Sequence, residues 1–412
     1  SEMCIRDSIY IDSSMIDYQK KRYVHAIEQY ETIFCPDKVA IFSAPGRSEV
    51  CGNHTDHQHG MVLATSINLD TIAVSAKNNN DVVRFVSDGY DMITLDINDL
   101  EVNNDEAGTT VSLIRGVLRG LKDHGYKIGG FNAYATSDVL VGAGLSSSAA
   151  FEVVVGTIIS GLYNDMKINS VEIAQISQYA ENVFFKKPCG LMDQMACSVG
   201  GMVNIDFKDP TKPIVKKVPT EFEKYDYSLC IVDTKGDHVD LTDDYAMIPS
   251  EMKKVANFLG EDYLRDCDSN EFYIRLDEIR EAVGDRPVLR AIHFFNEEYN
   301  VKNAVSSLEN GKFVEFLDAI RKSGNSSFKY LQNVYTTRDI QHQNISVALA
   351  LSESLLRNYG VCRVHGGGFA GTIQAFVKND FVSNYKEFIN KIFGENSCHV
   401  LKVRKYGGIK VM

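Results

Sequence analysis

Apolar positions recur at helical spacing near the beginning of the chain. In residues 18–34 the large apolar residues are separated by four, three and four positions, which predicts an amphipathic helix with a buried stripe formed by Tyr23, Ile27, Tyr30 and Phe34. The short apolar run 39–43 leads into Pro45-Gly46 and predicts a strand that enters a turn. Residues 62–76 are rich in β-branched side chains and partly alternate, so we expect paired strands there.

Two further helices are predicted towards the middle of the chain. Residues 146–163 are mostly apolar after three serines, which is typical of a buried helix. Another helix should begin at Asn169, because Asn is a good helix cap and Glu172 follows three residues later. We expect it to run to about Lys187 and to stop before Pro188, since proline lacks a backbone donor.

The second half of the chain mixes helices and strands without a regular alternation. Residues 208–220 hold three of the eight prolines, so we expect a domain boundary there. A strand at 227–233 follows, then a polar acidic segment, several helices and the strand-rich residues 363–377. This order favours an α+β fold over a doubly wound α/β fold.

Length and charge narrow the functional classes. The 412 residues suggest two domains. Lys+Arg 43 against Asp+Glu 55 gives a net charge of −12, which is unlike a protein that binds nucleic acid or an anionic membrane surface. No uncharged apolar stretch approaches the ~18 residues of a membrane helix, and the first residues lack the pattern of a secretory signal. The nine cysteines have no C-x-x-C spacing and fit neither a disulfide framework nor a zinc site, so we expect a cytosolic protein.

Two glycine-rich segments are candidates for contact with a ligand. Residues 142–150 read GAGLSSSAA and lead into the apolar helix, so serine hydroxyls and free N–H groups converge where a helix N-terminus favours phosphate. A serine-capped helix after a glycine turn is the plain alternative. No G-x-x-x-x-G-K-[ST], H-R-D or D-F-G motif is present, which excludes a P-loop. Residues 366–371 match G-x-G-x-x-G, but strand-like residues follow where a dinucleotide fold needs a helix, so we expect a strand–turn–strand.

Histidines and charged residues supply the remaining candidates. His54, His57 and His59 stand with Asp56 in GNHTDHQHG, where hydrogen bonding on an exposed loop is favoured over a zinc site. Arg47 follows Pro45-Gly46 in the predicted turn and gains meaning only in combination with other residues.

Two carboxylates stand out from the rest. Asp193 opens a new element in CGLMDQM among apolar neighbours, where a carboxylate needs a partner or a function. Glu181 lies late in the predicted helix 169–187. For one acidic run we expect instead a solvated loop: Asp237, Asp240, Asp243 and Asp244.

Taken together, four segments resemble the motifs of the galactokinase family in the GHMP kinase superfamily. They are APGRSEVCGNHTDHQHG at 44–60, VGAGLSSSAAFE at 141–152, PCGLMDQ at 188–194 and GGGFAGT at 366–372. The resemblance implies a domain at 1–212 similar to the second domain of a ribosomal S5 protein, a ferredoxin-like domain at 213–412, and an active site between them. It also implies a monomeric sugar 1-kinase that uses ATP and Mg²⁺, with D-galactose as the expected sugar.

The same resemblance implies roles for individual residues. Asp193 would accept or orient the proton of the sugar 1-hydroxyl, and Arg47 would neutralise charge beside it. Ser148 and Glu181 would help to hold Mg²⁺. The ATP phosphates would be wrapped by Gly142, Ala143, Gly144, Leu145, Ser146, Ser147 and Ser148. Contacts with sugar hydroxyls would come from Asn53, His54, Thr55, Asp56, Asp193 and Tyr245.

Three departures from the family pattern concern the sugar side. The family reads G-E-H-T-D-Y where residues 52–57 are GNHTDH, so the amide of Asn53 replaces a carboxylate. The family's Arg-x-Asn is here Arg47-Ser48-Glu49, and its Tyr-Asn-x-Arg-Arg is here the segment 245–249, YAMIP, without the arginines. One alternative is therefore a kinase for a related sugar, such as N-acetylgalactosamine or L-arabinose. The other is a non-catalytic sugar sensor, against which the retention of Arg47, Glu181 and Asp193 argues.

Overall fold

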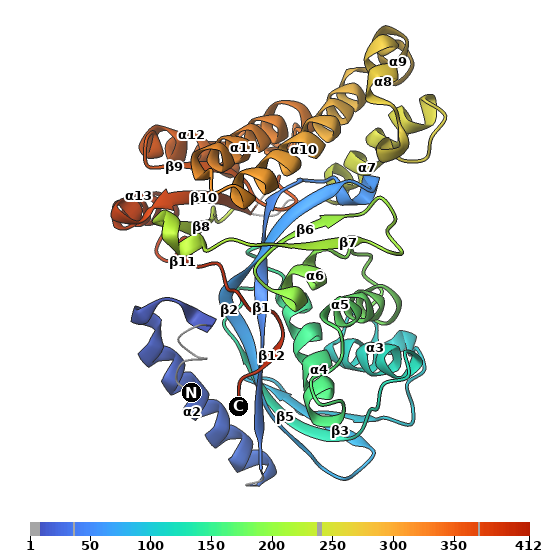
Figure 1. Ribbon diagram of the computed structural model, residues 1–412, viewed down its shortest axis with the longest axis vertical. Coiled ribbons are helices and arrows are strands. Elements are labelled where there is room, and N and C mark those ends of the chain that lie inside the picture. Colours follow the sequence, from blue (N-terminus) through green and yellow to red (C-terminus); the bar gives the residue numbers. More distant parts are fainter. Residues whose placement is uncertain (1–8, 36–37, 237–240, 370) are drawn as a thin grey trace.

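Two β-sheets organise the protein, and the structure is a computed structural model that describes residues 9–35, 38–236, 241–369 and 371–412 (Figure 1). The larger sheet has the strand order β12-β1-β2-β5-β3-β4, and β6 pairs with both β2 and β7. Its neighbouring strands are antiparallel except β3 and β5, which are parallel. The strands are β1 (Ala40–Cys51), β2 (Met61–Lys77), β3 (Val82–Ser87), β4 (Ile93–Asp96), β5 (Phe131–Ser137), β6 (Met202–Asp206), β7 (Ile214–Val218) and β12 (Ile409–Lys410).

Helices cover both faces of the larger sheet (Figure 1). Alternate residues of its strands point to opposite sides, so each face presents side chains on which helices can pack. Tyr23 and Tyr30 of α2 (Ile16–Phe34) pack on one face, against Ile72 and Val74 of β2. The other face, which includes Ala73, is covered by α3 (Thr110–Asp123), α4 (Ser147–Tyr163) and α6 (Met192–Val199), and α5 (Ser170–Tyr179) packs on these three helices.

The smaller sheet is wholly antiparallel, in the order β11-β8-β10-β9. Its strands are β8 (Tyr227–Asp233), β9 (Gly360–Val364), β10 (Thr372–Lys378) and β11 (Cys398–Leu401). One face packs against α12 (Asn344–Leu356) and α13 (Val382–Phe393). The other shares a hydrophobic core with α10 (Asp285–Glu309), α11 (Phe313–Ser326) and residues of β1 and β2, so the two sheets are joined by continuous packing.

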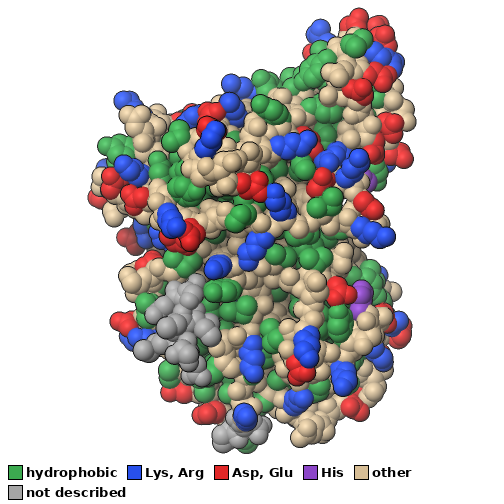
Figure 2. Space-filling view, viewed as in Figure 1, with side chains coloured by type: hydrophobic (Ala, Val, Ile, Leu, Met, Phe, Trp, Pro, Cys, Tyr) green, Lys and Arg blue, Asp and Glu red, His purple; other side chains and the backbone are tan. Residues whose placement is uncertain are grey.

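Three helices extend away from both sheets, namely α7 (Thr242–Phe258), α8 (Ser269–Ile274) and α9 (Leu276–Val283). Figure 2 shows charged side chains of both signs scattered over the visible face, with acidic groups denser at the tip formed by α8 and α9. No helix in the described part of the chain combines the length and apolar character needed to cross a membrane.

Several predicted elements are confirmed. The helix at 18–34 is α2, the buried helix is α4, the strand 227–233 is β8, and β9 and β10 flank the second glycine segment. The side chain of Asn169 caps α5 by accepting from the N–H of Val171. The α+β fold class is confirmed as well.

Other predictions are wrong, each because a distant strand or residue decides the outcome. β1 runs through Pro45-Gly46 without a turn, and a register shift between Pro45 and Arg47 accommodates the proline, so Arg47 lies on a strand. Residues 62–76 form the single strand β2, whose outer edge pairs with β6 at 61–65 and with β5 at 71–77.

Three further expectations have different outcomes: the loop at Asp243 and Asp244 is wrong, the helix from Asn169 changes its winding before it ends, and the boundary at 208–220 stays a prediction. The proline-rich residues 208–220 contain β7, which forms a hairpin with β6. The helix from Asn169 ends at Tyr179 and continues as a π-helical turn, Ala180–Phe184. Asp243 and Asp244 lie in the first turn of α7, while Asp237 and Asp240 lie outside the described residues. The division at residue 212 stays a prediction, and both β7 and β12 join the larger sheet from beyond it.

Candidate active site

The loop before α4 presents its backbone to solvent. Gly142, Gly144 and Ser146 have positive φ values of 80°, 68° and 58°, a region that glycine enters without strain. Ala143 and Leu145 are buried and anchor the loop, while both glycines are exposed. The next residues are the half-buried Ser147 and Ser148, in the first turn of α4. Free N–H groups of a helix N-terminus are therefore accessible to an anion at this loop.

Arg47 joins this loop to Asp193. Its Nε donates to Asp193 Oδ1 at 2.8 Å, and its Nη1 donates to the carbonyl of Gly144. The backbone N–H of Arg47 also donates to the carbonyl of Leu145 at 3.0 Å. Ser146, the N-cap residue of α4, donates from Oγ to Asp193 Oδ2 at 2.5 Å. Strand β1, the glycine loop and the first turn of α6 thus meet at one carboxylate.

The surroundings of Asp193 keep it ionised. Burial alone raises the pKa of this carboxyl, but the charge of Arg47 and the hydrogen bonds from Arg47 and Ser146 outweigh burial and lower it. The side chain of Asp193 is 34% exposed, against 9% for Arg47. A charged acceptor open to solvent therefore lies beside a loop with free backbone N–H groups, an arrangement that suits transfer of a phosphoryl group to a hydroxyl.

Glu181 lies in the π-helical turn after α5 and is buried, next to a second carboxylate, Glu152 of α4. Gln194 Nε2 donates to both, at 2.8 Å to Glu181 Oε2 and at 3.2 Å to Glu152 Oε2. Lys187 Nζ is 3.5 Å from Glu181 Oε1. Burial, followed by the charge of Glu181, raises the pKa of Glu152 well above its ordinary value. Its Oε1 is buried and accepts no hydrogen bond from the described residues.

This acidic pair fits a divalent cation that arrives with phosphates. Within the described ranges, no group of three or more His, Cys, Asp or Glu is arranged as a complete metal site. Mg²⁺ in phosphoryl-transfer sites takes only one or two carboxylates and completes its shell with phosphates and water. The unpartnered oxygen of Glu152 and the repulsion between the two carboxylates are what a nearby cation would relieve.

Residues 53–57, here called the 53–57 loop, contact the second glycine segment. His54 Nε2 lies 3.0 Å from the carbonyl oxygen of Gly367. Asp56 is next to Gly190, where an added Cβ would lie 2.5 Å from Asp56 Oδ2. Burial raises the pKa of Asp56, and the charges of Glu49 and Asp193 add to the rise against the opposing effect of His54.

Tyr245 reaches the same region from α7. Its hydroxyl donates to the carbonyl of Gly368 at 2.8 Å, and its ring packs edge-on against Phe369. The ring also covers Gly367, at which an added Cβ would lie 2.7 Å from Tyr245. The structure therefore brings the segments at 44–60, 142–148, 188–194 and 366–369 together, with Tyr245 beside them.

Two members of the predicted sugar set have internal roles. Thr55 is buried, and its Oγ1 lies 2.9 and 2.8 Å from the carbonyl oxygens of Gly52 and Met61, which share its one proton. Asn53 is fully buried, and its side-chain hydrogen bonds all go to protein groups.

The histidines of the GNHTDHQHG segment also differ from one another. His59 stacks on Tyr263, whereas both ring nitrogens of His57 are buried without a partner among the described residues.

The sequence prediction did not single out Glu152, Gln194 or His365. Glu152 is the only charged residue of α4, and that isolation in an apolar helix was a usable signal. Gln194 directly follows Asp193 and gave no signal of its own. His365 is buried between Ser48 Oγ and Thr372 Oγ1, both 3.0 Å away, and no local pattern reveals such partners.

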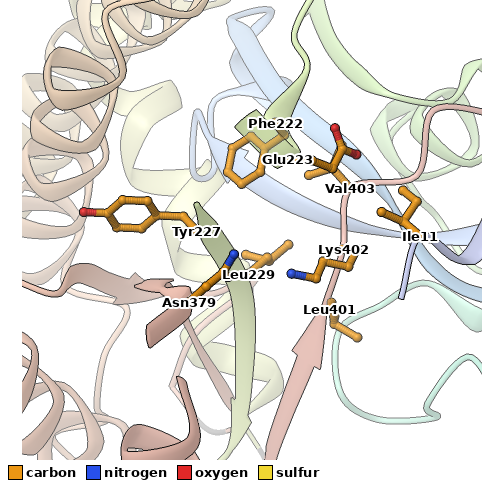
Figure 3. A pocket seen from close by; sticks show the side chains of 9 residues that line it. All are labelled: Ile11, Phe222, Glu223, Tyr227, Leu229, Asn379, Leu401, Lys402 and Val403. Atoms are coloured by element: carbon orange, nitrogen blue, oxygen red, sulfur yellow. The ribbon is translucent and has the colours of Figure 1, made fainter. Parts of the chain in front are cut away.

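A separate cavity of about 150 Å³ lies between the sheets (Figure 3). None of its lining residues belongs to the four segments. Its one cationic side chain, Lys402, donates to Ser228 Oγ at 2.8 Å. Apolar side chains such as Phe222, Leu229 and Leu401 form much of the remaining wall, so the cavity does not resemble an anion site.

Comparisons with known proteins agree with this geometry. The family described as "GHMP kinases N terminal domain" matches residues 112–201, and the "Galactokinase galactose-binding signature" matches residues 28–77. A galactokinase of Limosilactobacillus reuteri is 30% identical over 381 residues, covering 89% of this chain and 93% of the relative. A galactokinase of Streptomyces coelicolor is 28% identical and covers 85% of this chain and 88% of its own length.

Solved structures share the fold. The galactokinase of Lactococcus lactis, solved in complex with galactose, superposes with a TM-score of 0.79 at 22% identity over 94% of this chain and 99% of that one. The mevalonate kinase of Methanococcus jannaschii gives a TM-score of 0.59 at 16% identity over 89% of this chain and 99% of that one.

Proposed function

Because this chain belongs to the galactokinase family of the GHMP kinase superfamily and is accordingly a phosphotransferase, we propose that it transfers the γ-phosphoryl group of ATP to the 1-hydroxyl of D-galactose. The observation that carries the proposal is the joint binding of Asp193 by Arg47 and Ser146, which links an ionised carboxylate to the glycine loop. The galactose-binding signature over residues 28–77 supports galactose as the sugar.

Asp193 acts on the attacking hydroxyl. Since its pKa is lowered, it is ionised at neutral pH and accepts a hydrogen bond from the sugar 1-hydroxyl. A strongly basic group is not required, because the transition state of phosphoryl transfer is loose and the proton leaves late. Asp193 therefore mainly orients the hydroxyl and receives its proton as the bond to phosphorus forms.

Arg47 serves both reactants. It holds Asp193 through Nε and the carbonyl of Gly144 through Nη1, so it fixes the distance between the acceptor and the glycine loop. Its buried guanidinium stays charged, since Asp193 raises its pKa against the effect of burial. A fixed cation at this place stabilises the negative charge that spreads over the phosphoryl oxygens.

The glycine loop and α4 hold the ATP phosphates. Residues 142–148 offer backbone N–H groups and serine hydroxyls at the helix N-terminus. Ser148 and Glu181 would hold Mg²⁺, and Gln194 would fix Glu181 by donating to it and to the neighbouring Glu152. When bound, the metal neutralises phosphate charge.

We assign the sugar contacts to His54 and Tyr245, which border the second glycine segment, and to Asp56, which lies next to Gly190. Asn53 and Thr55 support this wall, because their polar groups are already used inside the protein. The altered residues around Asn53 and after Tyr245 favour one second candidate, a kinase for a related sugar such as N-acetylgalactosamine or L-arabinose.

The test is a panel of free sugars incubated with Mg-ATP and scored by ADP release and by the phosphorylated product. The proposal expects D-galactose to have the highest kcat/KM and to yield galactose 1-phosphate. A higher kcat/KM for another sugar would favour the second candidate. Binding of ATP and galactose without turnover would point to a sensor.

We further propose that the protein is a cytosolic monomer. All eight cysteines among the described residues are free thiols, as expected in a reducing compartment. Size-exclusion chromatography with light scattering tests the oligomeric state.

A further inference from the structure

The donors and acceptors of the Asn53 side chain all have hydrogen-bond partners within the protein. Its Nδ2 donates to Glu49 Oε1 at 3.0 Å and to the carbonyl of Gly366 at 2.7 Å. Its Oδ1 accepts from Asn333 Nδ2 at 2.9 Å and from Ser327 Oγ at 3.2 Å. An amide has two N–H donors and two acceptor lone pairs, so nothing remains for a ligand.

Helix α10 holds the backbone of the same residue. Glu297 Oε2 accepts from the N–H groups of Gly52 and Asn53 at 2.9 and 3.2 Å. His293 Nε2 lies 2.8 Å from the carbonyl oxygen of Asn53. Glu297 and His293 are both fully buried. Residue 53 therefore joins β1, α10 and the second glycine segment.

Glu49 is the charged partner in this arrangement. It lies four residues earlier on β1 and is buried, and its Oε1 accepts from Arg363 Nη2 at 2.7 Å as well as from Asn53. Arg363, also buried, donates from Nη1 to the carbonyl of Val50 at 2.7 Å. Removing one member of a buried pair leaves an uncompensated charge or donor, so Glu49 and Arg363 depend on each other.

The two departures from the family pattern, at positions 49 and 53, therefore involve side chains that are in contact with each other. Where the family pattern has Asn and Glu, this chain has Glu49 and Asn53, and the two side chains are hydrogen-bonded. We propose that this exchange of amide and carboxylate is compensated, and that Glu49 is a positioning residue which fixes the 53–57 loop, and with it His54 and Asp56, for sugar binding. The inference rests on the proposed function, since it takes this loop to face the sugar.

Single substitutions should break the pair and the reciprocal exchange should restore it. In Asn53→Glu, two carboxylates meet, the Gly366 carbonyl loses the amide donor of residue 53, and Glu49 Oε1 keeps only Arg363 as a donor. In Glu49→Asn, Arg363 loses its charged partner. Each single variant is expected to raise the KM for galactose by about 10- to 150-fold, the range for a hydrogen bond to a charged group, with the KM for ATP nearly unchanged. The double variant Glu49→Asn/Asn53→Glu should recover at least about tenfold relative to Asn53→Glu.

The outcomes distinguish loss of the contact between Glu49 and Asn53 from a general loss of folded structure. Thermal unfolding of all variants shows which are folded, and Glu49→Gln, which keeps the shape and removes the charge, replaces any single variant that does not fold. Glu106→Asn is a matched control, because Glu106 pairs with Arg115 away from the four segments and should change neither KM. A double variant whose loss equals the product of the single losses would overturn the proposal, as would equal changes in both KM values.

A failure of the proposed function gives a different result. If the wild-type protein phosphorylates another sugar, the wild type, the two single variants and the double variant are compared with that sugar as the substrate. The coupling between positions 49 and 53 can also be read from urea unfolding of the four proteins, which involves no substrate. Additive changes in the free energy of unfolding would count against the pair whatever the substrate proves to be.

Discussion

At the scale of single residues, the site separates two carboxylates by their surroundings. Burial raises the pKa of Asp56, whereas the ion pair with Arg47 lowers the pKa of Asp193 against the effect of burial. Opposite shifts of neighbouring carboxyls commonly mark different roles in one site. Here they fit the roles proposed above, an ionised acceptor for Asp193 and a less acidic sugar contact for Asp56.

Replacing Asp193 by Asn should leave sugar and ATP binding largely intact and lower kcat by about 10²-fold or more, the range for losing a general acid–base group. Steady-state kinetics with both substrates varied measures this split. Asp206→Asn is a suitable control, because Asp206 forms an ion pair with Arg265 at 2.9 Å outside the site, and its turnover should stay near normal. Normal turnover of Asp193→Asn would remove this residue from the mechanism.

His57 should make stability depend on pH. Burial, followed by the charges of His54 and His293, lowers its pKa from 6.5 to about 3. The unfolded chain therefore binds a proton at His57 below about pH 6.5, while the folded protein does not until about pH 3, so acid favours unfolding across that window. Between pH 7.5 and pH 5.0 the free energy of unfolding of the wild type, measured with urea, should fall by about 2 kcal/mol more than that of His57→Phe. Equal losses would show that His57 is protonated alike in both states.

At the scale of elements, the π-helical turn after α5 matters most. Glu181 lies in this turn, and Gln194 of α6 binds it at 2.8 Å. Such turns are rare and frequently occur at functional sites, since the extra residue changes the direction of the side chains that follow. The turn thus directs a buried carboxylate towards the N-terminal half of α4.

Glu181→Gln should raise the Mg²⁺ concentration needed for half-maximal rate, and excess Mg²⁺ should partly restore activity. The measurement is a Mg²⁺ titration at fixed ATP. Glu172→Gln is the matched control on α5, because Glu172 binds only Tyr126 among the described side chains and should leave the titration unchanged. An unchanged Mg²⁺ response in Glu181→Gln would make this carboxylate merely structural.

Elements with a local signal were predictable from the sequence, whereas elements set by distant partners were not. The apolar stripe of α2, the apolar run of α4 and the Asn169 cap can each be recognised from the residues of that segment alone. Nothing local shows that β2 pairs with β6 over one half and β5 over the other, or that Pro45 lies at a register shift. The glycine loop, Arg47 and Asp193 could be named from motifs, but the hydrogen bonds of Asn53 and His365 depend on residues far along the chain.

At the scale of the whole molecule, the two sheets share one packed core. Val50 and Leu63 of the larger sheet belong to the same cluster as Leu229 and Phe376 of the smaller one. Asp70, fully buried in β2, also pairs with Arg404, which follows the smaller sheet in sequence. The lobes predicted at 1–212 and 213–412 should therefore depend on each other for stability.

A fragment of residues 1–212 should fail to fold cooperatively by itself. It lacks β7, β12 and Arg404, so strand edges lose their partners and the buried Asp70 keeps only Arg22 of its two arginines. Circular dichroism on heating should show a broad transition or none, while the full chain unfolds in one sharp step. Co-expression with 213–412 is the control and should recover a soluble complex. A sharp transition of the fragment alone would establish an independent domain.

The position of β12 has a consequence for the order in which the protein is made. β1 emerges early from the ribosome, but β12, which pairs with it at Phe42 and Ser43, is synthesised only after all the helices and the smaller sheet. Until then the outer edge of β1 stays open to pairing with other chains, and partly made sheets of this kind are prone to aggregate. Production of this protein should therefore be sensitive to translation speed and to chaperones that bind nascent chains, even where the finished molecule is stable.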